Sequence, residues 1–279
     1  MNEQRLFALI GVGGFVAPRH LKAVHDTGHR VVAALDPSDS VGVIDSYFPD
    51  AHFFTEFERF DRHVDKLRRQ GPERAVEYVS ICSPNYLHDA HIRFALRSGA
   101  HAICEKPLVL NPWNVDALAE FEAESDRRVH TVLQLRLHPA IAAFREQVRA
   151  APADRRYQVD LTYITSRGRW YAVSWKGEEI KSGGIATNIG IHFFDILMWI
   201  FGGVRQSTVH LHGPTRAAGR LELERADVRW FLSLERGDLP AAAAGKTTYR
   251  TIDVDGESLE FSGGFTDLHT ELYRETLAG

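Results

Sequence analysis

The sequence has little cysteine and no excess of positive charge. Its 279 residues include two cysteines, Cys82 and Cys104, and 33 basic against 37 acidic residues, for a formal net charge of −4. Both cysteines stand in apolar runs, which predicts two reduced, buried thiols in a cytoplasmic protein rather than a disulfide framework. A nucleic-acid partner is excluded because phosphate contacts need a basic face, which this charge balance does not predict.

Long hydrophobic runs are also missing. The first residues, MNEQRLFALIGVGG, lack the basic start of a secretory signal and break at glycine after a few apolar positions. The most apolar later stretch, HFFDILMWIFGG, is shorter than a bilayer requires and contains Asp195. These absences predict a soluble, cytoplasmic globular protein with no membrane partner.

The first part of the chain alternates short apolar runs with amphipathic stretches. VVAALD, YVSICSP and HAICEKP indicate buried strands, while DAHIRFALRS, before Gly99, and a stretch beginning at Asn111 and Pro112 indicate helices. Apolar strands that alternate with helices are typical of a parallel sheet covered on both faces. We therefore predict a doubly wound, Rossmann-type α/β domain over residues 1–129.

The pattern changes after about residue 130. In YQVDLTYITS, from Tyr157, the odd positions are apolar and most even positions are polar, as in a half-buried strand. RLELERADVRWFLSLE and YRTIDVDGESLEF alternate in the same way, and Asp255-Gly256 marks a hairpin turn in the second. Residues 130–279 are predicted to form a second α/β domain with a large, mostly antiparallel open sheet.

A glycine-rich turn follows the first predicted strand. Gly11 and Gly13, followed by Phe15 and Val16, allow the backbone to approach a pyrophosphate at a helix N-terminus. The G-x-G-x-x-G motif is incomplete because its third position is Val16. Asp36 ends the second predicted strand, where an acid binds ribose hydroxyls and repels a 2′-phosphate. These residues predict NAD rather than NADP; the alternative for Asp36 is a turn or capping residue.

Polar residues follow the fourth predicted strand. SICSPNYLHDAH places Ser83, Asn85 and His88 at the carboxyl edge of the sheet, where doubly wound folds bind ligands. The spacing of His88 and His91 suits a metal pair, but no third ligand stands nearby. The same holds for the pair at 210 and 212. We predict no metal site.

The glycine turn, Asp36, SPNYLH and CEKPL together resemble the Gfo/Idh/MocA family of NAD(P)-dependent sugar and cyclitol oxidoreductases. In that family the E-K-P lysine projects into the active site beside the nicotinamide. The resemblance implies that Glu105 and Lys106 lie at the cofactor mouth, with Pro107 turning the chain out of the strand. A surface lysine after a strand is the alternative. Gln134, after the next predicted strand, completes the candidate cofactor residues.

A second block, SGGIATNIGIHFFDILMWI, carries Asn188, His192 and Asp195 on one face of an otherwise apolar predicted helix. The structural alternative is a satisfied core histidine. The block fits the family pattern G-G-x-x-x-D-x-G-x-H-x-x-D, with Asn188 in place of the first aspartate. The resemblance implies that His192 is the general base and that Asn188 orients a substrate hydroxyl. Lys106 and His192 could exchange roles as proton acceptor.

Longer blocks are similar to one subgroup, the bacterial UDP-N-acetylglucosaminuronate 3-dehydrogenases of the WbpB/WlbA type. These blocks are VSICSPNYLH, residues 159–177, ATNIGIHFFD, residues 226–233 and FSGGFTDLHTELY. The similarity covers nearly the whole chain and implies NAD-dependent oxidation of a sugar C3 hydroxyl in O-antigen synthesis, with 2-oxoglutarate recycling NADH. Members usually continue for about one more helix after RETLAG, so the C-terminus is expected to be short.

The implied substrate, a UDP-sugar uronate, carries a diphosphate and a carboxylate, and an acidic protein needs local cations to bind it. SRGRWYAVSWKGEEIK supplies basic and aromatic residues that hold anions and stack on uracil or a sugar. They are Arg167, Arg169, Lys176 and Lys181, with Trp170, Tyr171 and Trp175. The alternative is a solvated basic loop.

Two rival functions remain. One is another dehydrogenase of the same family acting on a simple sugar or inositol, against which the segment 167–181 argues. The other is a non-catalytic NAD-binding regulator, which has no need of both Lys106 and His192. An apolar sheet face in the second domain predicts a homo-oligomer, with a tetramer favoured.

Overall fold

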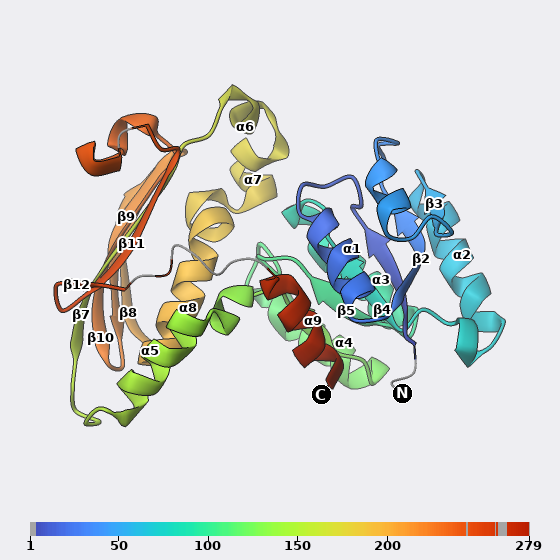
Figure 1. The fold of residues 1–279 in the computed structure, drawn as a ribbon, viewed down its shortest axis with the longest axis horizontal. Coiled ribbons are helices and arrows are strands. Elements are labelled where there is room, and N and C mark those ends of the chain that lie inside the picture. Colours follow the sequence, from blue (N-terminus) through green and yellow to red (C-terminus); the bar gives the residue numbers. More distant parts are fainter. Residues whose placement is uncertain (1–3, 244, 260, 262–266, 279) are drawn as a thin grey trace. The chain divides into compact units, whose positions relative to one another are not determined.

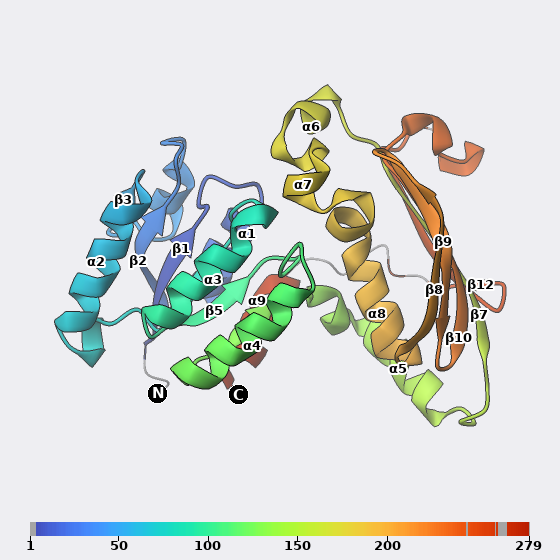
Figure 2. The ribbon, with the colours of Figure 1, turned by 180° about the vertical axis from the view of Figure 1, so that it is seen from behind.

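The computed structural model describes residues 4–243, 245–259, 261 and 267–278. The chain divides into two compact units, one formed by Met1–Val132 with His269–Gly279 and the other by Leu133–Leu268. In the described residues each unit is built on a six-stranded sheet (Figures 1 and 2). This confirms the predicted α/β class. The chain end differs from the predicted division, because its last helix belongs to the first unit.

The sheet of the first unit is parallel and has the order β3-β2-β1-β4-β5-β6, which confirms the Rossmann-type prediction. Its strands are β1 (Leu6–Ile10), β2 (Arg30–Leu35), β3 (His52–Phe54), β4 (Tyr78–Ile81), β5 (His101–Cys104) and β6 (Val129–Thr131). The strand order reverses between β1 and β4. Ligands of such sheets bind outside the carboxyl ends of the strands at this reversal.

Helices cover both faces of this sheet. They are α1 (Ala17–Asp26), α2 (Phe57–Arg69), α3 (His88–Arg97), α4 (Trp113–Ser125) and α9 (Leu268–Ala278). Helices α1 and α9 lie on one face, and α2, α3 and α4 pack on the other (Figures 1 and 2). Gly99, at φ +79°, follows α3 as predicted. The Asn111 side chain accepts a 3.2 Å bond from Trp113 N. Helix α4 begins at Trp113, one residue later than the sequence predicts.

The second unit has the strand order β12-β11-β7-β10-β9-β8 and is antiparallel except where β7 pairs with β10. Its strands are β7 (Tyr157–Thr165), β8 (Val204–His212), β9 (Arg216–Leu223), β10 (Ala226–Ser233), β11 (Thr248–Val254) and β12 (Glu257–Ser258). Its helices are α5 (Pro139–Ala150), α6 (Arg169–Val173), α7 (Glu179–Ser182) and α8 (Ile191–Phe201). Asp255 and Gly256 form the predicted turn, both at positive φ.

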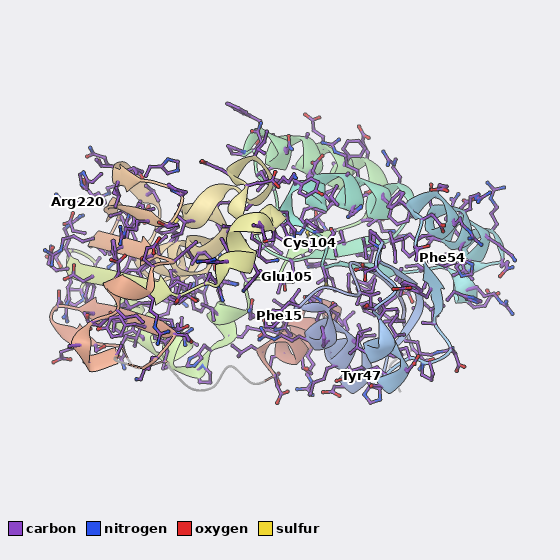
Figure 3. All side chains as sticks on the ribbon, turned by 90° about the horizontal axis from the view of Figure 1, so that it is seen from above. Phe15, Tyr47, Phe54, Cys104, Glu105 and Arg220 are labelled. Atoms are coloured by element: carbon purple, nitrogen blue, oxygen red, sulfur yellow. The ribbon has the colours of Figure 1, made fainter. Side chains whose placement is uncertain are left out.

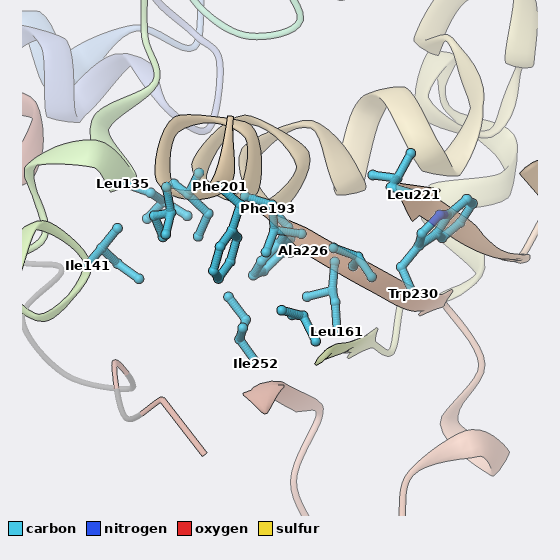
Figure 4. Close-up of a cluster of buried hydrophobic side chains, with 14 of the residues drawn as sticks. Leu135, Ile141, Leu161, Phe193, Phe201, Leu221, Ala226, Trp230 and Ile252 are labelled. Carbon is cyan, nitrogen blue, oxygen red and sulfur yellow. The ribbon is translucent and has the colours of Figure 1, made fainter. Parts of the chain in front are cut away.

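One face of the second sheet buries its apolar side chains against α5 and α8 (Figure 4). Tyr157, Val159 and Leu161 of β7 point into this core, as the alternation of the sequence predicts. The Tyr157 and Phe201 rings are 5.4 Å apart. The core therefore holds α8, and with it the polar positions 192 and 195, in a fixed place on the sheet.

The other face of this sheet carries ion pairs beside apolar side chains such as Phe231, so it is less apolar than the prediction assumed. Arg229 donates a 2.6 Å bond to Asp160 on β7, and Arg220 donates a 2.8 Å bond to Asp227. The cause is the two-residue period of a strand, which sends alternate charged side chains outward. The predicted homo-oligomer stays a prediction. If its subunits contact one another through this face of the sheet, the interface has to accommodate these ion pairs.

The π-helical turn Ala186–Gly190 leads directly into α8, and together with the preceding segment they form the helical run Glu179–Phe201. By length and composition alone this run could cross a membrane, and 50% of its apolar window is buried inside the protein. A core helix of a globular protein passes the same test. Asp195 within it is paired with Arg136.

Candidate active-site residues

The glycine turn connects β1 to α1 in a conformation that requires glycine. Gly11 has φ +84°, and a Cβ there would lie 2.6 Å from Ser83 N and 2.7 Å from Cys82 C. A Cβ at Gly13 would lie 3.1 Å from the Asp36 carboxylate. Phe15 is 90% exposed, and Val16 stands directly before α1. The tight backbone and the adjoining helix N-terminus fit the predicted dinucleotide site.

Asp36 follows β2 and organises this turn. Its carboxylate accepts a 2.8 Å bond from Gly13 N and a 2.9 Å bond from Ser38 N. The turn-forming alternative for this residue is thus realised. Because a carboxylate has about four acceptor positions, these two bonds leave capacity for ribose hydroxyls.

The residues after β4 are buried and bonded to the protein. Ser83 Oγ lies 2.8 Å from His91 Nδ1, and Asn85 is 5% exposed. His88 is fully buried, with Nδ1 2.7 Å from Pro107 O and Nε2 2.9 Å from Ser83 O. His88 therefore links the segment after β4 to the E-K-P segment. Burial lowers the pKa of both histidines, that of His91 to about 4.

Glu105 follows Cys104, the last residue of β5 (Figure 3). Lys106 comes next in the chain. Glu105 is 8% exposed, and its Oε1 lies 3.1 Å from His20 Nε2 and 3.4 Å from His269 Nε2. Burial alone would raise the pKa of Glu105, but the hydrogen bonds from the two histidines outweigh it and hold this pKa well below its usual range. Glu105 is therefore engaged within the protein, and its predicted place at the cofactor mouth stays a prediction. Lys106 is half-buried.

Among the described residues, one group of side chains could hold a metal ion. It consists of His20, Glu105 and His269, whose ligand atoms lie within 4.8 Å of one another. The sequence prediction considered other pairs, because His20 and His269 lie far from Glu105 along the chain. Of the pairs considered, His88 and His91 bond to protein atoms, and the pair at 210 and 212 lies on the exposed strand β8.

In the second unit the structure joins two predicted substrate residues. Asn188 Nδ2 donates a 3.0 Å bond to Tyr171 Oη, and both residues are buried. Burial raises the pKa of Tyr171. His192, one turn further on, is half-buried. The third predicted residue, Asp195, accepts a 2.8 Å bond from Arg136 Nε, so its partner is a residue that sequence reasoning missed. A lone cation within the apolar stretch TVLQLRL was the available signal.

Gln134 begins a short helical turn, Gln134–Leu137, in the second unit. Its Oε1 is buried, and no described residue hydrogen-bonds to it. A buried carbonyl without a partner costs free energy, and each such group calls for a specific explanation. An acceptor available to a ligand amide or hydroxyl is consistent with the predicted role.

The segment 167–181 is largely exposed. Lys176 Nζ lies 4.1 Å from the Trp175 ring centroid and 5.9 Å from that of Trp170. Lys181 pairs with Glu178 at 2.8 Å, which engages one of the four predicted anion-binding cations. Arg167 and Arg169 are exposed.

Comparison with known proteins gives consistent results over both units. The Gfo/Idh/MocA model described as an oxidoreductase family, NAD-binding Rossmann fold, matches residues 5–132, and the model of its C-terminal alpha/beta domain matches residues 155–257. The WlbA (WbpB) dehydrogenase from Thermus thermophilus is 54% identical, with a TM-score of 0.95 over 99% of this chain and 89% of its own. It has been solved in complex with NAD and alpha-ketoglutarate, and with NAD and UDP-GlcNAcA.

A more distant solved structure agrees in fold, and curated relatives match parts of the sequence. The WlbA dehydrogenase from Bordetella pertussis is 17% identical over 100% of this chain and 84% of its own, with a TM-score of 0.77. D-glucoside 3-dehydrogenase from Escherichia coli is 28% identical over 140 residues, 49% of this chain and 39% of its own length. The matched part of three curated relatives spans 39%, 41% and 58% of their lengths.

Proposed function

This chain belongs to the Gfo/Idh/MocA oxidoreductase family, and we propose that it oxidises the C3 hydroxyl of UDP-N-acetylglucosaminuronic acid to a 3-keto sugar with NAD. The observation that carries the proposal is the 54% identical T. thermophilus WlbA, which is known in complex with NAD and UDP-GlcNAcA. Its alpha-ketoglutarate complex extends the proposal to recycling of NADH by 2-oxoglutarate. The setting would be O-antigen synthesis in the cytoplasm.

The first unit fits the cofactor. The turn at Gly11 and Gly13 leaves no room for a Cβ, and the N-terminus of α1 follows it. Asp36 presents a carboxylate that suits ribose hydroxyls and repels a 2′-phosphate, so NAD is favoured over NADP. When bound, NAD supplies the acceptor for the hydride that leaves the sugar carbon.

Two residues are candidates for handling the hydroxyl proton. His192 would accept it as a general base, and the ammonium of Lys106 would stabilise the developing alkoxide; the reverse assignment stays open. Asn188, bonded to Tyr171 through its amide nitrogen, would orient a hydroxyl without taking its proton. For the anionic groups of the substrate we propose Arg167 and Lys176, with the Trp175 ring as a stacking surface.

The test is absorbance at 340 nm with NAD and UDP-N-acetylglucosaminuronic acid, with and without 2-oxoglutarate, beside parallel arms with free glucose and inositol. We expect NADH to form only with the UDP-uronate. With the 2-oxoacid added, less NADH should accumulate at 340 nm while mass spectrometry finds more of the 3-keto sugar, because the 2-oxoacid reoxidises NADH. Equal or faster turnover of a free sugar would point to another dehydrogenase of the family. Tight NAD binding in calorimetry without turnover on any arm would favour the regulator.

A further inference from the structure

We propose that helix α9 is a positioning element for Lys106 and acts through the Glu105 carboxylate. His269 and Tyr273 of α9, together with His20 of α1, hold that carboxylate against the backbone of Lys106. The proposal rests on the proposed function only where it gives Lys106 a part in the reaction. All of these residues belong to the first unit.

The network is buried and continuous. Glu105 Oε1 lies 3.1 Å from His20 Nε2 and 3.4 Å from His269 Nε2. On the far side of His20, Nδ1 lies 2.7 Å from Tyr273 Oη, which lies 2.6 Å from Ser80 Oγ. The exposed fractions are 0% for His20, Ser80 and Tyr273, 6% for His269 and 8% for Glu105. Water is therefore not the partner that satisfies these groups.

One arrangement of protons satisfies every contact. Each histidine, in its neutral form, donates Nε2–H to Glu105, and Tyr273 donates its hydroxyl to His20 Nδ1. Ser80 then donates to the Tyr273 oxygen. Burial lowers the pKa of His20, which favours the neutral ring that this arrangement needs. Glu105 is then an ionised carboxylate held by one donor from α1 and one from α9.

The carboxylate in turn fixes the start of the E-K-P segment. Lys106 N donates a 3.2 Å bond to Glu105 Oε2, and Glu105 N donates a 2.9 Å bond to Ile81 O of β4. On the other side, Pro107 O lies 2.7 Å from His88 Nδ1. The backbone of Lys106 is thus held on one side by the network of α1 and α9, and on the other by His88. The charge of Lys106 also helps to lower the pKa of Glu105.

A shift of about 1 Å in a group that takes part in chemistry can cost about 10²-fold in rate, so the loss of one donor should be measurable. Three variants separate positioning from general stability. His269→Leu removes the donor from Glu105, whereas His269→Gln retains an N–H donor near the same place. His130→Gln is the matched control, because His130 is a half-buried histidine of the same unit on strand β6.

Two readouts are needed. The first is the rate at which an amine-reactive ester labels Lys106 at limited conversion, measured by peptide mass spectrometry relative to the exposed Lys66 and Lys246. It needs no substrate. The second is turnover of NAD and the UDP-uronate. We expect His269→Leu to label at Lys106 about threefold faster or more, and to lose about tenfold in kcat with NAD affinity unchanged. His269→Gln and His130→Gln should resemble the wild type.

Equal labelling of Lys106 in all four proteins, with the fold intact by circular dichroism, would overturn the proposal. A His269→Gln variant as impaired as His269→Leu would also overturn it. So would a change in the labelling of the wild type on adding Zn²⁺ or a chelator, because a bound metal would replace the protons of the network. If the labelling result holds but no protein turns over the UDP-uronate, the positioning network stands and the proposed substrate fails.

Discussion

The first unit and the segment 167–181 of the second unit hold their candidate site residues in opposite ways. In the first, the residues around Lys106 are buried and bonded to one another, and even the charged Glu105 is 8% exposed. In the second, the segment 167–181 is largely exposed, with Trp170 54% exposed and Lys176 resting on tryptophan rings. The fold therefore fixes the first group, whereas a ligand would have to fix the second. We expect changes around Lys106 to lower kcat and changes in the segment 167–181 to raise KM.

The largest expected effect is that of Lys106→Met. Removing a group that stabilises or transfers the reacting proton should lower kcat about 10³-fold, while NAD affinity changes less than about threefold. Stopped assays at 340 nm and calorimetry measure the two quantities. Lys66→Met, on the exposed side of α2, is the control. A full loss of NAD binding in Lys106→Met would contradict the expectation that changes around Lys106 lower kcat and leave NAD affinity nearly unchanged.

Acid should weaken the buried first unit. His91 has a pKa of about 4 in the folded protein, because burial disfavours its charged form. Its folded pKa is below the unfolded value, so its contribution is present above about pH 6.5 and is lost as the pH falls towards 4. The loss amounts to about 3 kcal/mol.

The measurement is the free energy of opening of the first unit, from hydrogen exchange between pH 7 and pH 4. His91→Asn, which retains a group near Ser83, should flatten this pH dependence, and a change at the exposed His25 should not. An unchanged slope in His91→Asn would refute the assignment.

The glycine turn tests backbone crowding. Gly11→Ala should destabilise the first unit by about 2 kcal/mol and abolish NAD binding, since its Cβ would meet backbone atoms at 2.6 to 2.8 Å. Gly28→Ala is the matched control, because Gly28 has a similar φ of +80° with nothing within 4 Å of a Cβ. Urea unfolding compares the two. Equal costs would mean that the positive φ, rather than close approach, requires glycine at position 11.

The smallest effect is expected in the exposed segment. Lys176→Met should raise KM for the UDP-uronate about fivefold with kcat retained, and the effect should shrink at high salt because salt screens a charge that is not fully buried. Lys246→Met, at an exposed position of the second unit, is the control. A fall in kcat with KM unchanged would place Lys176 with the buried group instead.

Local patterns allowed much of the fold to be predicted. The buried run at β4, the alternation along β7 and the turn at Asp255 and Gly256 are set by neighbouring residues, and the structure confirms them. The prediction placed residues 130–279 together in the second domain, whereas His269–Gly279 belong to the first unit, because a short-range pattern does not show what a segment packs on. Part of the FSGGFTDLHTELY block, residues 262–266, lies outside the described residues.

The sequence by itself determined the parallel sheet, the glycine turn and the place of Lys106 at a strand end, because periodicity and turn chemistry act over a few residues. Only the tertiary structure decided which partner each buried polar group takes. Glu105 pairs with His20, 85 positions away, and with His269, 164 positions away. No spacing rule encodes such pairs. A buried carboxylate is stable only with donors beside it, and folding alone brings those donors there.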